Sequence, residues 1–435
     1  YQGRTDEAYR WFYKSTWNAA WQGPGYLWCA RISTLQRRYD DALDEVEKSL
    51  VSGWHNHEAR GLKTALLRLT GRLEEARHWA EESLEADAFN FFCLNELRLL
   101  GAPQAAETQA ARMRQEAHNY NEAALDYAAA GLWSEAVGLL QKGVECGAAD
   151  PMTYYYMAWC LEHTDAAAAA EMRSKAASMS PDYCFPNRLE AVLALRVAEA
   201  ENPADAHAPY YLGCLYYDKR QYDLAIAGWQ ESARRDDTYA ITWRNLALAA
   251  LNKQQDEKSA VTYMERAFSL AQNDARLLME LDQLYKRLHR PHAERLAHLQ
   301  RYPELIRMRD DLILEEATLL NFTGAYQEAM TLIDGHQFHP WEGGEGKVSG
   351  QYQMSRVELA KKAMAGGRME EACRLLEECL TYPHHLGEGK LHGAQENDFY
   401  YLLGCAHQAL GQADEAHTCW LKAITGPTEP AAALY

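Results

Sequence analysis

"YYLGCLYYDKRQYDLAIAGWQES", residues 210–232, is the stretch of sequence that decides the fold of this chain. Its central phrase, "RQYDLA" at 220–225, is typical of the end of one helix, a tight turn, and the acidic first turn of a second helix. The alanine that closes the phrase, Ala225, is small enough to let two helices approach closely. The stretch therefore predicts a hairpin of two packed helices.

The same phrase recurs along the chain. Other copies are "GRTDEA" (3–8), "RRYDDA" (37–42), "GRLEEA" (71–76), "GLWSEA" (131–136), "GAYQEA" (324–329), "GRMEEA" (367–372) and "GQADEA" (411–416), with a weaker copy, "GAPQAA", at 101–106. The closing alanines Ala8, Ala42 and Ala76 are equally spaced, and Ala225 follows Ala191 at the same interval. That interval, about 34 residues, is the period of tetratricopeptide (TPR) repeats.

The best copy also matches the TPR pattern at single positions, with Leu212, Gly213, Tyr216, Ala225 and Trp229 at the offsets of the family. The chain therefore resembles a TPR protein over essentially its whole length. The resemblance implies an all-α fold, a right-handed superhelical solenoid of about a dozen TPR-like helix hairpins, some of them degenerate.

The spacing departs from the TPR period in three places. The alanines at 76, 106 and 136 follow one another at a shorter interval, which predicts shortened helices or turns. A full period leads from Ala136 to Ala170, but Ala191 follows too soon for a helix pair, so "MSPDYCFP" at 179–186 is expected to replace a first helix. The intervals that join the alanines at 329, 372 and 416 are longer than the period.

These departures divide the chain into three parts. We expect an N-terminal TPR-like array that starts in mid-repeat (1–180), central TPR repeats (181–334), and C-terminal TPR-like repeats with two extended glycine-rich loops (335–435). The first phrase lacks a preceding helix, and "GPTEPAAALY" at 426–435 stops where another helix would begin. Because a solenoid needs capped ends, we expect these residues to belong to a longer polypeptide.

The composition argues against several classes of partner. The chain has 44 basic and 62 acidic residues, a net charge of -18, so neither nucleic acid nor an anionic membrane is an expected partner. No apolar run is long enough to span a bilayer. The ten cysteines form no C-x-x-C pair, and most lie among alanine and leucine. We expect reduced core thiols and a cytoplasmic location, with no zinc, other metal or cofactor.

"HPWEGGEGKVSGQY", residues 339–352, resembles a phosphate-binding loop only superficially. The position that would need glycine holds Trp341, and Val348 follows Lys347 where serine or threonine is required. The stretch has a partner instead: "GEGKVSGQ" begins at Gly344 and "GEGKLHGAQ" begins at Gly387, each at the same offset from the alanine of its own repeat. Since equivalent loops of successive repeats stack side by side, the two segments are expected to be immediate neighbours.

The adjacent loops would bring many polar and aromatic residues onto one edge. These candidate ligand- or partner-binding residues are His339, Trp341, Glu342, Glu345, Lys347, His384, His385, Glu388, Lys390, His392, Asn397 and Asp398. A structural alternative is a pair of rigid turns in which Glu345 and Glu388 cap the following helices and the lysines are solvated. No catalytic residue is assigned, and the histidines lack the spacing of a metal site.

A narrower resemblance rests on four segments: "FHPWEGGEGKVSGQY" (338–352), "HLGEGKLHGAQENDFYY" (385–401), "APYYLGCLYYDKRQYDLAIAGW" (208–229) and "FYKSTWNAAW" (12–21). Together they resemble the C-terminal region of bacterial YphG-like proteins. That family joins a large N-terminal β-rich domain of uncharacterised function to a long TPR tail, and its genes often accompany carbohydrate-metabolism genes. The resemblance implies a carbohydrate or a sugar-processing protein as a partner, and it implies no activity for particular residues.

Three functions remain open. The first is an interaction scaffold, not an enzyme by itself, that binds a protein or peptide partner or its own missing N-terminal domain. Aromatic clusters such as "YRWFYKSTWNAAW" (9–21) and "PMTYYYMAW" (151–159) could line its concave groove. The second is a carbohydrate-binding or carbohydrate-active site to which the paired loops contribute and which the missing N-terminal domain completes, with Glu342 or Glu345 opposite Glu388. The third is a phosphosugar sensor with Lys347 and Lys390 over backbone amides.

Overall fold

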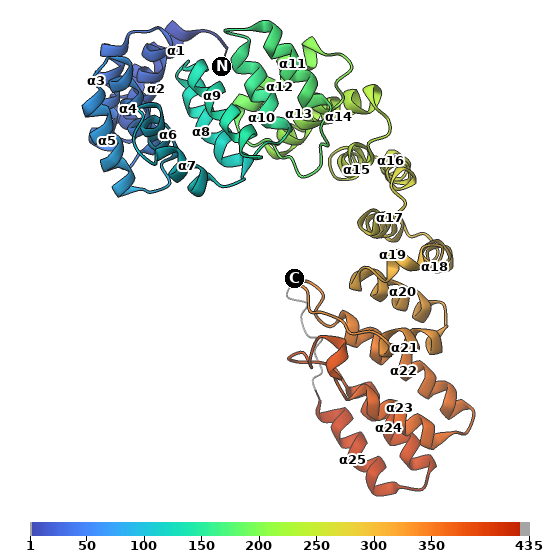
Figure 1. Ribbon diagram of the computed structural model, residues 1–435. Helices are drawn as coiled ribbons and strands as arrows, with labels where there is room; N and C mark the ends of the chain where they lie inside the picture. Colours follow the sequence, from blue (N-terminus) through green and yellow to red (C-terminus); the bar gives the residue numbers. More distant parts are fainter. Residues whose placement is uncertain (1, 427–435) are drawn as a thin grey trace. The chain divides into compact units, whose positions relative to one another are not determined.

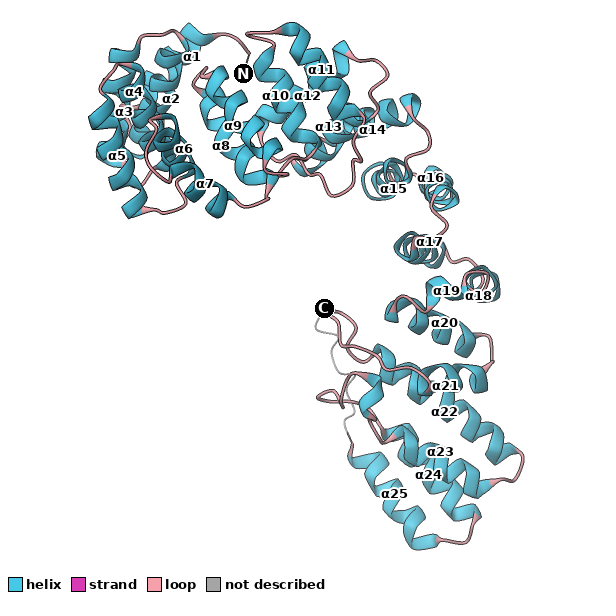
Figure 2. Ribbon diagram, viewed as in Figure 1, coloured by secondary structure: helices cyan, strands magenta, loops and turns pink. Residues whose placement is uncertain are grey.

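The computed structural model describes residues 2–426, and within that range every regular element is a helix (Figure 2). The all-α expectation is therefore confirmed. The segment at which the sequence stops, "GPTEPAAALY" (426–435), lies outside the described residues except for Gly426, so the expectation drawn from it stays a prediction. Contacts within the chain group it into two compact units, unit 1 (Tyr1–Thr238) and unit 2 (Tyr239–Tyr435). The three-part division concerns repeat types and stays a prediction.

Unit 1 consists of helix hairpins in chain order, with helices labelled in Figure 1. Its helices are α1 (Thr5–Ser15), η1 (Ala19–Trp21), α2 (Gln22–Leu35), α3 (Tyr39–Ser52), α4 (His57–Leu69), α5 (Leu73–Ala86), α6 (Phe91–Leu99), α7 (Ala105–Met113), α8 (Ala117–Ala129), α9 (Trp133–Glu145), α10 (Pro151–Leu161), α11 (Ala166–Ala177), α12 (Leu189–Glu201), α13 (His207–Asp218) and α14 (Tyr222–Arg235).

Unit 2 continues the same architecture. Its helices are α15 (Ala240–Ala249), η2 (Ala250–Gln254), α16 (Glu257–Leu270), α17 (Ala275–Arg287), α18 (His292–Leu299), α19 (Pro303–Ile306), α20 (Asp310–Phe322), α21 (Tyr326–Asp334), α22 (Lys347–Ala365), α23 (Met369–Cys379), η3 (His384–Leu386), α24 (Asn397–Ala409) and α25 (Ala413–Thr425). Hairpins such as α22–α23 and α24–α25 pack along their lengths.

From residue 37 onwards, every copy of the recurring phrase forms the turn between two successive helices. Its first residue is left-handed, as at Gly71 (φ 80°) and Gly411 (φ 79°), which ends one helix shortly before the next one starts. Arg37 and Arg220 adopt the same conformation, both at φ 59°, although it is unfavourable for a residue with a side chain. The closing alanine packs as expected: Ala225, like its counterparts at 42, 76, 136, 329, 372 and 416, has no exposed surface.

Two positions of the repeat are displaced by one residue. Ala105 and Ala169 are the buried alanines of their helices, whereas Ala106 and Ala170 are exposed, so the predicted register is wrong at both places. In "GAPQAA", the backbone of Gln104 is left-handed (φ 59°) in addition to that of Gly101, so α7 begins only at Ala105.

The other departures from the TPR period are confirmed. The shorter spacing reflects shortened helices, since α6 and α7 have 9 residues each. Residues 179–188 are not helical, and α12 follows them without a first helix of its own. The long intervals near the C-terminus come from two extended loops, residues 335–346 and 380–396.

The first helices of unit 1 contact hairpins from later in the same unit. A Cβ atom at Gly131, which is left-handed between α8 and α9, would lie 2.4 Å from Leu35 Cδ1 at the end of α2. Only glycine fits so close to another helix. This contact brings α1 and α2 opposite α8, α9 and α10, so that the first repeats and the fourth and fifth hairpins border one groove.

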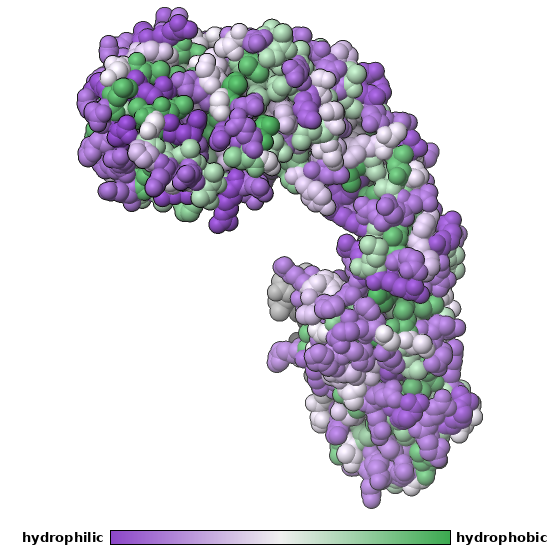
Figure 3. Space-filling model, viewed as in Figure 1, coloured by the Kyte–Doolittle hydropathy of each residue, from purple (hydrophilic) through white to green (hydrophobic). Residues whose placement is uncertain are grey.

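Within residues 2–426, no helix is both long enough and apolar enough to cross a membrane. None of the ten cysteines is in a disulfide, and most of these thiols are buried. The surface drawn in Figure 3 is mostly hydrophilic, with apolar residues gathered in separate patches.

Candidate functional site

The two glycine-rich segments form adjacent loops in unit 2, which we call loop 1 (residues 335–346) and loop 2 (residues 380–396). Each loop is anchored by one buried apolar side chain, Phe338 in loop 1 and Leu386 in loop 2, both 1% exposed. The two anchors belong to the same hydrophobic core as Val348 and Tyr352 of α22. The loops are therefore part of the folded core of unit 2.

Backbone contacts join the two loops directly. The Phe338 N–H donates to the carbonyl of His385 at 2.8 Å, and the Gln337 side-chain amide donates to the carbonyl of His384 at 3.2 Å. Gly387 has φ 71°, and a Cβ there would lie 2.5 Å from the carbonyl oxygen of Phe338. The predicted adjacency of the look-alike segments is thus confirmed, and at Gly387 it depends on the absence of a side chain.

Glu388 of loop 2 caps the helix that follows loop 1. Its two carboxylate oxygens accept hydrogen bonds from the backbone N–H groups of Gly346 and Ser349, each at 2.7 Å, at the start of α22. A carboxylate at this place satisfies free amides and complements the helix dipole. The sequence expectation that Glu388 caps its own following helix is wrong, because the cap reaches back to the preceding loop.

A hollow of about 280 Å³ lies between the loops. Five of the candidate residues line it: His339, Trp341, Glu342, Glu345 and Glu388, together with Pro340, Gly344, Val348, Leu386 and Gly387. Trp341 is half-buried, and its indole lies so close to Gly344 that a Cβ there would be 2.3 Å from the ring. The lining of the hollow therefore combines one indole ring, the carboxylates of glutamate residues and the apolar side chains of Val348 and Leu386.

Asp310, the first residue of α20, holds loop 1 at its start. Its carboxylate lies 2.8 Å from His336 Nε2 and 3.0 Å from His339 Nδ1, and it accepts the His339 N–H at 2.8 Å. Burial disfavours the charge, but these hydrogen bonds outweigh it and lower the pKa of Asp310. The imidazole of His339 remains mostly exposed beside the hollow.

The remaining candidate residues lie outside the hollow. Lys390 forms an ion pair with Glu396 at 2.7 Å, and the Asn397 amide donates to the carbonyl of Ala423 at 2.8 Å. His385 is half-buried, with its ring 6.2 Å from that of Tyr352. Exposed positions that do not line the hollow are held by Lys347, His384, His392 and Asp398.

Two of the backbone amides next to Lys347, those of Gly346 and Ser349, already donate to Glu388. Lys390 is engaged in its ion pair with Glu396. In residues 2–426, no group of three or more His, Cys, Asp or Glu side chains has the geometry to hold a metal ion.

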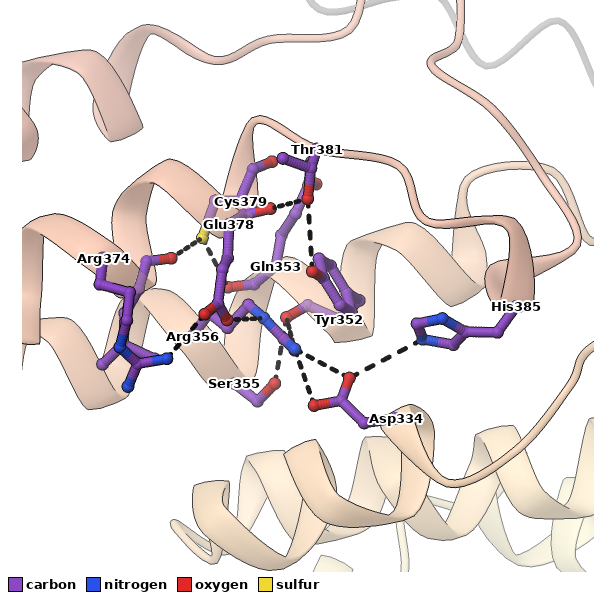
Figure 4. Close-up of polar contacts among 11 residues, drawn as sticks. Asp334, Tyr352, Gln353, Ser355, Arg356, Arg374, Glu378, Cys379, Thr381 and His385 are labelled. Carbon is purple, nitrogen blue, oxygen red and sulfur yellow. Dashed lines mark hydrogen bonds and ion pairs between the residues drawn. The ribbon is translucent and has the colours of Figure 1, made fainter.

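Arg356 of α22 ties the bases of both loops together (Figure 4). Its guanidinium donates to both oxygens of Asp334, at 2.8 Å each, and to Glu378 at 2.9 Å. Asp334 ends the helix before loop 1, and Glu378 lies at the end of the helix before loop 2. The buried guanidinium also lies 3.5 Å from the ring centre of Tyr352. The ion pairs around this buried guanidinium connect the starts of both loops.

A second candidate site lies in unit 1, where a groove of about 750 Å³ separates α1 and α2 from α9, α10 and α12. Five aromatic side chains line it: Trp11, Phe12, Trp28, Trp133 and Trp159. Phe12 and Trp28 stack on one side at 5.3 Å, and Trp133 and Trp159 meet edge to face at 5.4 Å on the other. The aromatic clusters at 9–21 and 151–159 thus contribute to one groove.

His163 and Glu190 are titratable residues that line the groove. His163 stacks on Trp133 at 4.0 Å, and burial lowers its pKa, which favours the neutral imidazole. Glu190 lines the groove and pairs with Arg188 at 3.2 Å. Arg188 also donates to Glu122 at 3.0 Å and to Asp126 at 3.3 Å. Burial opposes the charge of Arg188, but these three carboxylates raise its pKa.

Several residues that build these sites carry no sequence signal. Phe338, Leu386 and Arg356 resemble ordinary helix or loop residues, because they act through partners that are distant in the sequence. For Trp11, Trp28, Trp133 and Trp159 the abundance of aromatic residues was a signal, but it did not tell which rings face the groove.

Residues 398–425, which cover most of α24 and all of α25, match the sequence model of the tetratricopeptide repeat. Similar solved structures include yeast Tom70 (15% identity over 92% of this chain and 96% of that one, TM-score 0.27). PilF of Pseudomonas aeruginosa is 17% identical over 50% of this chain and 89% of its own, with a TM-score of 0.28. A MamA fragment from Desulfovibrio magneticus RS-1 is 18% identical over 45% of this chain and 97% of its own, with a TM-score of 0.26.

The matched segment identifies the last hairpin as a tetratricopeptide repeat. The hairpins before it share its two-helix architecture and its buried turn alanine. The described residues thus form an all-helical array of TPR-type hairpins.

Proposed function

We propose that this chain is an interaction scaffold that binds a segment of a partner protein in the aromatic groove of unit 1. The observation that carries the proposal is the groove itself, about 750 Å³ in volume and bordered by aromatic side chains on two sides. Small-molecule sites are typically concave, apolar and within this size range, and grooves that bind peptide segments are likewise lined by apolar and aromatic side chains. Tryptophan is also the residue type most enriched among side chains that dominate binding energy.

The exposure of Trp11 supports the same proposal. This side chain is 62% exposed at the rim of the groove, although burying an indole is strongly favourable. A partner segment in the groove would cover Trp11 without any rearrangement of the surrounding helices. Its neighbours Phe12 and Trp28 are already stacked, so little conformational entropy would be lost on binding.

The chain offers a matched pair of variants for the test. Trp11→Ala removes an exposed ring that lines the groove, whereas Trp17→Ala removes a ring that is 76% exposed and does not line it. Peptides are selected from a random dodecapeptide library on the immobilised full chain, and the affinity of the enriched peptides is measured for both variants by calorimetry.

The proposal expects Trp11→Ala to weaken binding by at least tenfold, since an aromatic anchor contributes about 2 kcal/mol or more. Trp17→Ala should leave the affinity within twofold. Equal losses in the two variants, or a library from which no peptide is enriched, would contradict a groove that binds protein segments.

A second candidate function is a small-ligand subsite for carbohydrate in the hollow between loops 1 and 2. The observation that favours it is the combination of Trp341 with the carboxylates of Glu342 and Glu345 in a hollow of about 280 Å³. An indole can stack on a sugar ring while carboxylates accept hydrogen bonds from its hydroxyls. Glu388 is committed to the backbone of α22, which argues for binding and against a catalytic carboxylate pair.

Calorimetry with a panel of monosaccharides and oligosaccharides tests this subsite. The affinity for any sugar that binds should fall at least tenfold in Trp341→Ala. It should be unchanged in Trp54→Ala, a half-exposed indole that lies in unit 1. Absence of binding to every sugar, or binding that is insensitive to Trp341, would contradict the carbohydrate subsite.

The resemblance to YphG-like proteins, with the carbohydrate context that it implies, favours this second candidate function. The buried thiols support a reducing, cytoplasmic setting for either function.

A further inference from the structure

One edge of unit 1 carries aromatic side chains in three successive turns. These turns connect α1 to α2 (residues 16–21), α3 to α4 (53–56) and α5 to α6 (87–90), and they alternate with turns that contain the recurring phrase. Because the two helices of a hairpin are antiparallel, the two kinds of turn lie on opposite edges of the array. Four large rings of this edge are strongly exposed: Trp17 (76%), Trp21 (61%), Trp54 (48%) and Phe89 (66%).

Contacts between the three turns make them neighbours, and we call the surface formed by Trp17, Trp21, Trp54 and Phe89 the aromatic edge. The Ser49 hydroxyl near the end of α3 donates to the carbonyl of Gly23 at the start of α2, at 2.8 Å. The third turn contacts the second, since the Asn90 amide donates to the carbonyl of His57 at 3.3 Å. The Asp87 carboxylate also lies 3.1 Å from His57 Nδ1. The rings therefore belong to one surface.

The aromatic edge is nearly free of charge, although the whole chain has a net charge of -18. Apart from His55, Asp87 is the only acidic or basic residue of the three turns, and it lies beside His57. Enrichment in aromatic residues and depletion of charge are typical of the centre of a protein interface. An uncharged aromatic surface is also complementary to itself, because rings pack on rings in offset or edge-to-face pairs.

We propose that the aromatic edge is the interface through which two copies of this chain form a symmetric dimer. At about 200 Å² for a fully exposed ring, the exposed parts of the four side chains amount to roughly 500 Å² per copy. Two such surfaces would bury about 1,000 Å², the lower limit of a specific interface, before backbone and polar atoms at the rim are counted. A twofold dimer places the same surface of each copy face to face, which suits a self-complementary edge.

The dimer goes beyond the proposed function, because none of the four rings lines the groove of unit 1. Burial of apolar surface drives its formation, while the net charge of each copy opposes it. Added salt screens this repulsion, and sulfate strengthens apolar burial. We therefore expect a dissociation constant in the micromolar range that decreases as ammonium sulfate is added.

Sedimentation velocity of the full chain over a wide range of concentration tests the dimer. The wild-type protein should change from monomer to dimer, and Trp17→Ala should raise the dissociation constant at least tenfold, as expected for an aromatic anchor of an interface. Phe89→Ala, in the third turn, is an independent variant with the same expected direction. The control is Tyr401→Ala, which removes a ring of unit 2 that is 57% exposed and should leave the dissociation constant unchanged.

The groove and the aromatic edge are distinguished by their variants. Trp17→Ala should weaken the dimer and leave peptide affinity in the groove within twofold, whereas Trp11→Ala should do the reverse. A wild-type chain that remains a monomer up to about 100 µM would overturn the dimer, whatever else covers the edge. A dimer that persists in both Trp17→Ala and Phe89→Ala, or one that Trp11→Ala abolishes, would overturn it as well. Each of these results leaves the peptide test of the groove standing.

Discussion

The carboxylate of Glu388 accepts a hydrogen bond from the backbone N–H of Gly346 at 2.7 Å, so one glycine-rich loop caps the helix that begins at the end of the other. The second oxygen of Glu388 accepts from Ser349. Because these amides have no partner inside the helix, the cap couples the two repeats energetically. The hollow between the loops depends on this contact, since Glu388 also lines it.

Removal of this cap should destabilise the start of α22. For Glu388→Ala we expect local opening to become easier by about 1–2 kcal/mol, the usual loss for a capping residue. Hydrogen exchange of the amides at 346–350 measures this loss. The control is Glu345→Gln in the neighbouring loop, an exposed carboxylate that should leave exchange unchanged. Unchanged protection in Glu388→Ala would show that the cap contributes nothing.

A side chain at Gly387 should disrupt the contact between the loops. The new Cβ would lie 2.5 Å from the Phe338 carbonyl oxygen, and φ of 71° disfavours alanine as well. We expect Gly387→Ala to destabilise unit 2 by about 2–4 kcal/mol. Gly389→Ala is the matched control, because nothing lies within 4 Å of its Cβ position and its φ is unexceptional. Calorimetric unfolding of both variants measures the difference, and equal transitions would contradict the close packing.

Arg356 should be far more important for stability than Arg374, although both pair with Glu378. The Arg356 side chain is 5% exposed and the Arg374 side chain is 62% exposed. Arg356→Ala should cost about 2–3 kcal/mol, less than a fully buried pair because Asp334 and Glu378 remain partly solvated. Arg374→Ala should cost below about 0.5 kcal/mol. Urea unfolding, followed by a signal from unit 2, measures the free energy of unfolding of both variants. Similar losses of stability would contradict the role of Arg356 in connecting the two loops.

The stability of unit 1 should depend on pH through Asp126. Its pKa is raised to about 7 in the folded protein, above the ordinary value of 3.8, so the folded state binds the proton more tightly. The stability that this proton contributes is full below pH 3.8, falls as the pH rises towards 7, and is lost above it. Relative to wild type, Asp126→Asn should therefore gain about 2 kcal/mol between roughly pH 5 and pH 8. Urea unfolding at a series of pH values measures the gain, and a difference that does not change with pH would contradict the raised pKa.

The architecture of the hairpins could be predicted from sequence because it depends on local patterns. A left-handed residue, an acidic first turn and a small alanine lie within one short phrase, and the equal offset of the two loops from Ala329 and Ala372 predicts their adjacency. Where the turn chemistry was weaker, as in "GAPQAA", the register was wrong by one residue.

The side-chain partnerships of the sites could not be predicted in the same way. Glu388 caps a helix 42 positions earlier, and Arg188 binds Asp126 across 62 positions. Such contacts depend on how successive hairpins rotate, and no local period records that rotation. The same reason explains why the aromatic residues were recognised as abundant before it was clear that Trp11 and Trp159 face one groove.

The most direct measurement of the central claim is hydrogen exchange of the full chain with and without a peptide selected on it. Binding in the groove of unit 1 predicts slower exchange in α1, α2, α9, α10 and the start of α12, with loops 1 and 2 of unit 2 unchanged. Protection confined to residues 335–396, or spread without preference over both units, would contradict the groove as the place where this scaffold holds its partner.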